Sequence, residues 1–508
     1  MRIRDENQKT GHLLAFISKE KREDNFSFFF PVEGLGKFDA LLKIIKGFEN
    51  CSESVKEKYH FIGYSVADIS RIEDTFPEID KLWMLQFDLE EFLTEDSQFV
   101  ENFAKLVIAR QARKEGPMFP DIITGPMATG SNFYDRVEEL REIWENLKMG
   151  ENLLLRAPRR FGKSSLLNHI SKNPLPGWRI CYVDLEGGKS SEDFVEHILT
   201  GLIHKEECNA CLPKHLIGLE VWKESAGKKL EVVRQERKQI RESWQEYAET
   251  ILASMDSVTD RSLLILDEVS FLLEDMIASN YQDKVNELMT WFHDARKKTK
   301  KLSFILSGSE YLPTFLESFG IGGQLHDLKT VHLGLFNKEI TREFIFLTLA
   351  GKKTAVRLSE IDLMLTLIGE PIPYFLQLLL DTLSRVCRER KNLSFDQIET
   401  IYYQELLGSE SKRYFETIQL QLERYSRYGE RYRAGTESIL DELAVNDSVD
   451  LDHLEVIWAG ATGSKERFEV ILRILQDDFY VKQENGKAFF ASKLLKDWWG
   501  RHGLAGKR

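Results

Sequence analysis

The chain has 508 residues, of which 42% are hydrophobic and 30% charged, with only 12 prolines, and this composition excludes a disordered or a collagen-like protein. At roughly 100 to 200 residues per domain, the length predicts three or four domains. The net charge of -13 disfavours a surface coated with basic residues for sequence-independent nucleic-acid binding.

The sequence predicts a soluble, cytoplasmic protein with no membrane partner. Its apolar runs fall short of the roughly 18 residues that a transmembrane helix needs, and its first residues lack a secretory pattern. Five cysteines are too few for a disulfide framework over this length, which fits a reducing compartment.

Residues 1–120 are predicted to form an N-terminal domain of unknown role. Short apolar segments at 28–32 and 82–92 are separated by charged turns, and the block carries no recognisable motif. The density of proline and glycine from Arg113 to Gly130 predicts a linker. An amphipathic helix is expected to follow it, over residues 132–148.

A short apolar strand from Asn152 to Leu155 leads into a loop of the phosphate-binding type and then into a helix. The loop and the start of the helix consist of Ala157, Pro158, Arg159, Arg160, Phe161, Gly162, Lys163, Ser164 and Ser165. They match the pattern G-x-x-x-x-G-K-[ST], except that Ala157 replaces the first glycine. In such loops backbone N–H groups cradle the phosphates, Lys163 would lie against the β and γ oxygens, and Ser164 would ligate Mg²⁺. The loop therefore predicts a site for ATP and Mg²⁺.

Strand-like segments at 178–185, 263–266 and 302–306 alternate with helical ones, which is typical of a parallel sheet covered by helices on both faces. The predicted fold class is therefore α/β, with a P-loop NTPase core over 121–335. Between the first two strands, residues 228–241 alternate in charge and predict a solvated helix.

The strand at 263–266 ends in Asp267 and Glu268, the pattern of a Walker B strand. Asp267 would hold Mg²⁺ in the second shell or through water, and Glu268 would polarise the attacking water. The alternative is that both carboxylates merely end a core strand. Because the two halves of the site occur in the expected order, we predict nucleotide binding, with Lys163 and Glu268 as catalytic residues. Ser307 or Ser309, after the next strand, is a candidate sensor of the nucleotide, with a plain strand-end turn as the alternative.

These residues resemble the archaeal-type ATPase group of P-loop proteins, relatives of the AAA+ and STAND NTPases, whose loop commonly reads GPRRxGKTSLL. Residues 132–140 are similar to the family's box before the loop, which implies a nucleotide contact for Arg136. Residues 369–377 resemble the Gly-x-Pro element of the family's helical lid, which implies a contact from Pro371 or Pro373. The lid is expected over residues 336–410.

Residues 411–508 resemble the winged-helix domain of these ATPases, with helices at 436–443, 451–458 and 465–475 and a hairpin through Gly486 as the wing. The basic residues that could meet DNA phosphates are Lys465, Arg467, Arg473, Lys482 and Lys487. In an acidic chain an ordinary solvated face is favoured instead. Trp498 and Trp499 are predicted to pack in the core rather than to stack on bases.

A zinc site is a further candidate, because His204, Cys208, Cys211 and His215 bring metal-ligand residue types into a short span. Structural zinc sites usually pair two such motifs across a longer loop, so ordinary thiols are favoured over zinc.

The sequence thus predicts an ATP-binding and ATP-hydrolysing molecular switch that couples its nucleotide state to an unidentified protein partner or to oligomerisation. Three alternatives stay open: a STAND-like regulatory ATPase that forms homo-oligomers with ATP, a DNA-binding AAA-type ATPase that acts through its winged helix, and a nucleotide-binding scaffold without hydrolysis.

Overall fold

The computed structural model describes residues 10–20, 23–31, 59–64 and 79–88, and residues 120–503 with short gaps, the longest at 217–225. The chain divides into two compact units. One unit comprises Met1–Tyr134 and Leu335–Thr417, and the other comprises Asp135–Gly334 and Ile418–Arg508. The helices predicted as a lid therefore group with the N-terminal block, and the C-terminal tail groups with the P-loop core. The division into four domains stays a prediction.

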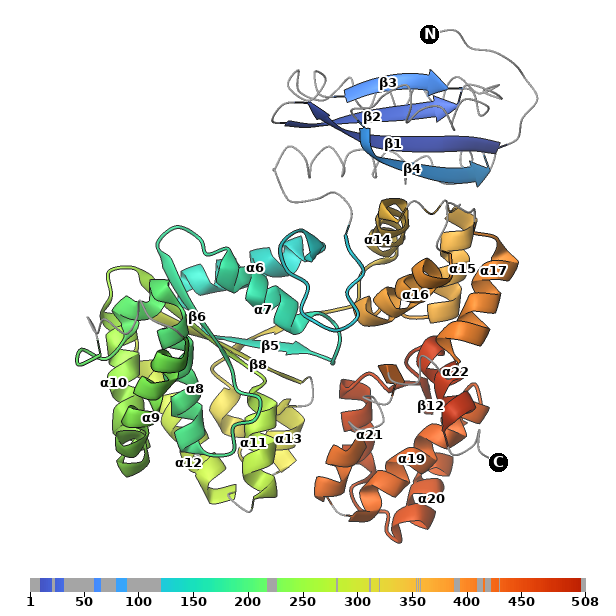
Figure 1. The fold of residues 1–508 in the computed structure, drawn as a ribbon. Helices are drawn as coiled ribbons and strands as arrows, with labels where there is room; N and C mark the ends of the chain where they lie inside the picture. The colour runs from blue at the N-terminus through green and yellow to red at the C-terminus, as the bar shows by residue number, and fades with distance from the viewer. Residues whose placement is uncertain are drawn as a thin grey trace. The chain divides into compact units, whose positions relative to one another are not determined.

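The second unit contains a five-stranded parallel sheet in the order β6-β7-β8-β5-β9, with helices on both of its faces (Figure 1). Its strands are β5 (Leu153–Ala157), β6 (Trp178–Asp184), β7 (Arg261–Asp267), β8 (Leu302–Ser309) and β9 (Lys329–His332). The predicted α/β class is confirmed. In β7 every residue after Arg261 is buried, which is why its sequence is a continuous apolar run rather than an alternating one.

Helices alternate with these strands as predicted, and the helix expected over residues 132–148 begins later, at Val137. The helices are α6 (Val137–Met149), α7 (Lys163–Lys172), α8 (Ser191–His204), α9 (Ala226–Glu242), α10 (Trp244–Ser257), α11 (Val269–Ala278), α12 (Gln282–Lys298) and α13 (Leu312–Ser318). The prediction of a solvated helix at 228–241 holds only for the outer side of α9, because Val233 and Ile240 are buried. Arg237 of α9 also forms an ion pair of 2.5 Å with Glu196 of α8.

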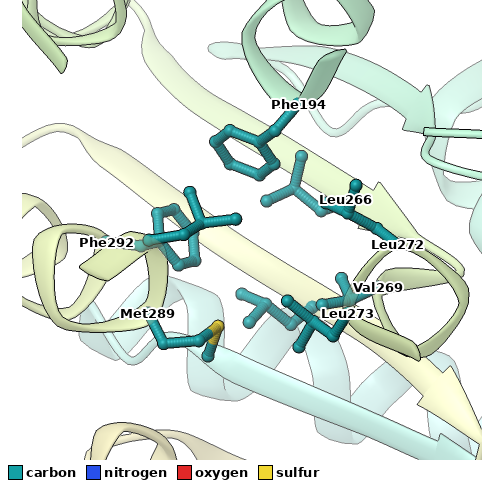
Figure 2. A pocket seen from close by; sticks show the side chains of 9 residues that line it. Phe194, Leu266, Val269, Leu272, Leu273, Met289 and Phe292 are labelled. Atoms are coloured by element: carbon teal, nitrogen blue, oxygen red, sulfur yellow. The ribbon is translucent and has the colours of Figure 1, made fainter. Parts of the chain in front are cut away.

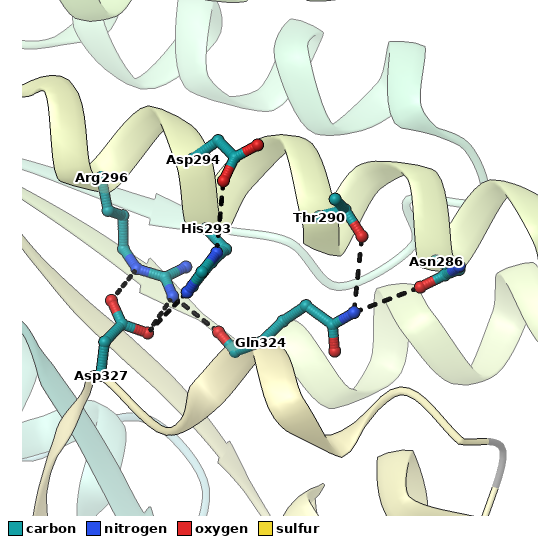
Figure 3. A network of polar contacts seen from close by, with 7 residues as sticks. All are labelled: Asn286, Thr290, His293, Asp294, Arg296, Gln324 and Asp327. Carbon is teal, nitrogen blue, oxygen red and sulfur yellow. Dashed lines mark hydrogen bonds and ion pairs between the residues drawn. The ribbon is translucent and has the colours of Figure 1, made fainter.

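A buried arginine ties the edge of the sheet to α12 (Figure 3). The Arg296 side chain is fully buried, and its Nη2 donates hydrogen bonds of 2.7 Å to Asp327 and to the carbonyl oxygen of Gln324. The Gln324 side chain in turn reaches Asn286 and Thr290 of α12. These contacts fix the short helical turn Gly322–Leu325 and the chain that leads into β9.

A small apolar cavity lies between the sheet and α8, α11 and α12 (Figure 2). Its volume is about 10 Å³, and Phe194, Leu266, Met289 and Phe292 are among its lining residues. A cavity of this kind has about the size of one water molecule but offers it no polar partner. It is a packing gap in the core, not a ligand site.

The C-terminal part of the same unit is a helical module with a small sheet in the order β10-β12-β11. Its elements are α19 (Glu430–Val445), β10 (Val449–Asp450), α20 (Leu451–Thr462), α21 (Phe468–Asp477), β11 (Val481–Glu484), β12 (Lys487–Phe490) and α22 (Lys493–His502). The predicted hairpin is confirmed: Asn485 and Gly486 have φ of 52° and 76°, and a two-residue type I′ turn requires a positive φ at both positions. Trp498 and Trp499 are buried, as predicted.

The other unit contains a four-stranded sheet in the order β3-β2-β1-β4. The strands are β1 (Thr10–Glu20), β2 (Glu23–Pro31), β3 (Tyr59–Tyr64) and β4 (Ile79–Asp88), and only β2 and β3 run parallel. The predicted apolar segments at 28–32 and 82–92 fall largely on β2 and β4, and their remaining residues lie outside the described ones. The predicted linker has no regular element from Pro120 to the short turn Gly130–Asn132, and its first residues also lie outside the described ones.

Residues 336–410, where a helical lid is expected, contain helices in this unit. They include α14 (Lys338–Gly351), α15 (Leu358–Ile368), α16 (Pro373–Val386) and α17 (Phe395–Thr400). The residues that resemble the Gly-x-Pro element separate α15 from α16, since Gly369 has a φ of 79° and α16 begins at Pro373. Over the described part of the chain, every helix is too short or too polar to cross a membrane.

Candidate nucleotide-binding site

The predicted phosphate loop connects the end of β5 to the start of α7. Ala157 is the last residue of β5 and is fully buried, so the missing first glycine stands in the sheet rather than in the open part of the loop. Gly162 caps α7 with a φ of 91°, a conformation that favours glycine. The loop therefore delivers the chain to the amino end of a helix, where free N–H groups and the helix dipole attract phosphate.

Arg136 holds this loop from the preceding helix. It precedes α6 in the left-handed conformation and is 4% exposed. Its Nη1 lies 2.7 Å from Glu139, and its Nη2 donates a hydrogen bond of 3.1 Å to the carbonyl oxygen of Phe161. Burial lowers the pKa of Arg136, and Glu139 partly offsets this effect. The structure thus places Arg136 on the loop itself, while its predicted contact with the nucleotide stays a prediction.

The two predicted halves of the site meet at Lys163 and Glu268. Lys163 Nζ lies 3.5 Å from Glu268 Oε1, and both side chains are largely buried. Burial raises the pKa of the Glu268 carboxyl and Asp267 adds to this, whereas Lys163 and Arg159 lower it. Glu268 has a φ of 56° and caps α11, so the chain turns sharply where the acidic pair leaves the sheet.

The Asp267 carboxylate is 1% exposed and is bound from both neighbouring strands. Ser307 Oγ of β8 donates to Asp267 Oδ1 at 2.6 Å, and Tyr182 of β6 donates to Oδ2 at 2.8 Å. Ser307, one of the two candidate sensors, therefore contacts the predicted metal ligand. The side chain of Ser309 lies outside the described ones. Sequence reasoning missed Tyr182, and the only signal for it was a phenol near the end of the strand before Asp267.

Two loop residues make contacts that the motif did not predict. The guanidinium carbon of Arg159 lies 4.4 Å from the ring centroid of Phe271 on α11. The ring of Phe161 packs edge-on against Phe479, which follows α21, with 5.1 Å between centroids. The loop thus contacts both the helix after the acidic pair and the C-terminal module. For Pro158, Arg160, Ser164 and Ser165 the predicted nucleotide contacts stay predictions.

The residues present fit a magnesium nucleotide. Lys163 offers an ammonium group for phosphate oxygens, and Ser164 and Asp267 offer the hydroxyl and carboxylate oxygens that Mg²⁺ prefers. In this sheet β5 and β7 lie on either side of β8, so the loop after β5 and the acidic pair after β7 leave the same edge. Ligands of open α/β sheets bind at that edge. Pro371 and Pro373 belong to the other unit, so their predicted contact stays a prediction.

The zinc candidate is not supported, because the described residues contain no group of three or more His, Cys, Asp or Glu side chains that could hold a metal ion. Cys208 and Cys211 are buried, and Cys208 Sγ donates to the carbonyl oxygen of Ile180 at 3.3 Å. His215 instead lies 3.0 Å from Glu236 of α9. The described cysteines form no disulfide, and burial raises the pKa of Cys211 to about 11. The short spacing in sequence suggested that the four side chains come together, but His215 pairs with Glu236 instead of the thiols.

The parallel sheet, the loop after β5 and the acidic pair after β7 define the core of a P-loop NTPase. Residues 149–316 match the family described as an AAA domain, so this part of the chain is similar to AAA domains.

One solved structure shares the fold at low sequence identity, and a second is similar to a lesser degree. The Walker-type ATPase PABY2304 of Pyrococcus abyssi aligns with a TM-score of 0.53 and 19% identity, over 74% of this chain and 99% of its own. The Aeropyrum pernix ORC2 protein, solved as ADPNP-ADP complexes, aligns with a TM-score of 0.43 and 12% identity, over 74% of this chain and 94% of its own. No curated protein matches the chain.

Proposed function

We propose that this protein is an ATP-dependent molecular switch, which binds Mg·ATP at the loop after β5, hydrolyses it with Glu268 and passes its nucleotide state to a partner or to further copies of itself. The observation that carries the proposal is the 3.5 Å pair between Lys163 and Glu268. A phosphate-binding lysine and a candidate base, distant in sequence, meet at the edge of the sheet where nucleotides bind.

The residues divide the chemistry between them. Lys163 and the loop would bind the β and γ phosphates, and Ser164 and Asp267 would hold Mg²⁺, which neutralises charge on the phosphate oxygens when it is bound. Phosphate oxygens would compete with Glu268 for Lys163. Binding of ATP would thus free the Glu268 carboxylate to accept a proton from the attacking water.

The C-terminal module is the proposed output element. Three helices followed by a hairpin, with the sheet order β10-β12-β11, fit the predicted winged helix. Phe479 of this module packs on Phe161 of the phosphate loop, so a change in the loop would reach the module directly.

The charges of the module favour a protein partner over DNA. Lys465 pairs with Glu455 at 2.6 Å, and Lys487 lies 3.9 Å from Asp450. Lys482 lies over the Phe479 ring. Lys465, Lys482 and Lys487, which could meet DNA phosphates, therefore already have partners in the chain.

The test compares Lys163→Ala and Glu268→Gln with wild type. Loss of the ammonium group should weaken ATP binding about 10- to 100-fold, the usual effect of removing a hydrogen bond to a charged group. Glu268→Gln should keep ATP affinity within a few-fold and slow phosphate release about 100-fold or more, as expected for loss of a general base. Binding is measured with a fluorescent ATP analogue and hydrolysis by phosphate release.

Lys172→Ala and Glu246→Gln are matched controls, because both side chains are exposed on helices α7 and α10. Unchanged affinity in Lys163→Ala would overturn the site. Hydrolysis by Glu268→Gln at the wild-type rate would remove Glu268 as the base. Binding without hydrolysis in wild type would favour the nucleotide-binding scaffold.

A further inference from the structure

The Asp267 carboxylate is held by residues that no motif singles out. In the registers of the sheet, Tyr182 pairs with Ile265 and Ile265 pairs with Ile305. Side chains alternate between the two faces of a strand, so Asp267 and Ser307, each two residues further on, share a face with Tyr182. Tyr182 of β6, Asp267 of β7 and Ser307 of β8 thus lie on one face of the sheet. The tyrosine side chain is long enough to reach Asp267, two residues beyond its direct partner Ile265.

The hydrogen bonds leave the carboxylate little freedom. Oδ1 accepts from Ser307 Oγ at 2.6 Å and from the backbone N–H of Glu268 at 2.9 Å, while Oδ2 accepts from Tyr182 at 2.8 Å. A carboxylate has about four lone-pair sites, and three are taken. The remaining site suits one metal-bound water and excludes bidentate ligation.

We propose that Tyr182 is a positioning residue of this site, whose hydroxyl, together with that of Ser307, fixes the orientation in which Asp267 meets the water shell of Mg²⁺. This inference rests on the proposed function, because it concerns the metal that accompanies the nucleotide. Partners that orient a metal-binding group typically contribute 10- to 100-fold to metal affinity.

The chemistry of the donors supports this role. Both are neutral hydroxyl groups, so they stabilise the charged carboxylate without cancelling its charge. An ordinary phenol is protonated at neutral pH, so Tyr182 donates its proton in this hydrogen bond.

Tyr182→Phe is the informative variant, because it removes the hydroxyl and keeps the ring. We expect the Mg²⁺ concentration for half-maximal binding of N-methylanthraniloyl-ADP to rise about 10-fold or more. Binding of the same probe in EDTA should stay as in wild type. Ser307→Ala should shift the Mg²⁺ dependence in the same direction.

Tyr247→Phe is the matched control. Tyr247 Oη also donates to a carboxylate at 2.8 Å, that of Glu236, but it does so between α10 and α9. The control should lose similar thermal stability and keep the wild-type Mg²⁺ dependence.

An unshifted Mg²⁺ dependence in Tyr182→Phe, or an equal shift in Tyr247→Phe, would overturn the inference while wild-type binding still supports the proposed function. If wild type binds the probe no better than Lys163→Ala does, with or without Mg²⁺, the proposed function itself fails.

Discussion

Glu268 combines a buried carboxyl with a neighbouring ammonium, and burial has the larger effect on its pKa. A base must be deprotonated, so hydrolysis should fall as the pH drops through this raised pKa. We therefore expect the acid limb of kcat/KM for ATP to lie above the ordinary glutamate value of about 4.3. The measurement is steady-state phosphate release between acid and neutral pH.

The pH dependence of stability tests independently whether the pKa of Glu268 is raised. A carboxyl with a raised folded pKa contributes stability that is full below the ordinary value and is lost as the pH rises through the folded one. Glu268→Gln imitates the protonated form, so at pH 8 it should melt no lower than wild type. A lower Tm at pH 8, or an acid limb at or below the ordinary value, would contradict the raised pKa.

The site residues show what a sequence can predict at this scale. Lys163, Asp267 and Glu268 were predictable because each directly follows a recognisable strand or loop. Tyr182 was not, because its contact depends on the register between β6 and β7 and on which strands are neighbours. The contact of Arg136 with the Phe161 carbonyl depends on a left-handed backbone that no residue type signals.

At the scale of the elements, the turn after α21 is the part of the C-terminal module that packs against the phosphate loop. Phe479 has a φ of 64°, a conformation that costs a non-glycine residue about 1 to 2 kcal/mol and that persists only where packing maintains it. Its ring packs on Phe161, and Asp477 lies 3.4 Å from Thr314 of α13.

Phe479→Ala should loosen the phosphate loop. An aromatic pair contributes about 0.5 to 1.5 kcal/mol beyond the area it buries, so hydrogen exchange at residues 159–162 should accelerate about 2- to 10-fold. Phe395→Ala is the control, since that ring is 40% exposed on α17. Unchanged exchange in the loop would show that the aromatic pair does not hold it.

The elements that were predicted each carry a periodic pattern or a turn signal, as the Asn485-Gly486 hairpin illustrates. β9 was missed, since Lys329–His332 is short and only one of its residues, Val331, is buried. The prediction of a solvated helix was correct for only one side of α9, because the many charged residues obscured the buried ones on its other side.

For the whole molecule, the proposed switch predicts that ATP changes the state of association. Glu268→Gln should trap the ATP-bound form, so its mass by light scattering should increase with Mg·ATP and not with Mg·ADP. Added duplex DNA should leave this mass unchanged. Steeply salt-dependent DNA binding would favour the DNA-binding ATPase instead. A mass that does not change when ATP is added would remove self-association from the proposal.

The grouping of the chain into units was beyond sequence reasoning, because it depends on long-range contacts. The tail after Ile418 joins the P-loop core, and the helices from Leu335 join the N-terminal block. No local pattern records such pairings, since turn and charge signals describe only neighbouring residues.

The position of β9 has a practical consequence for dissecting the protein. The AAA domain match ends at residue 316. β9 lies beyond that residue, yet it pairs with Leu153 and Leu154 of β5 inside the matched region. A fragment cut at residue 316 would turn β5 into an edge strand with unpaired backbone groups, which invites aggregation. Any fragment intended to fold alone must therefore extend past His332.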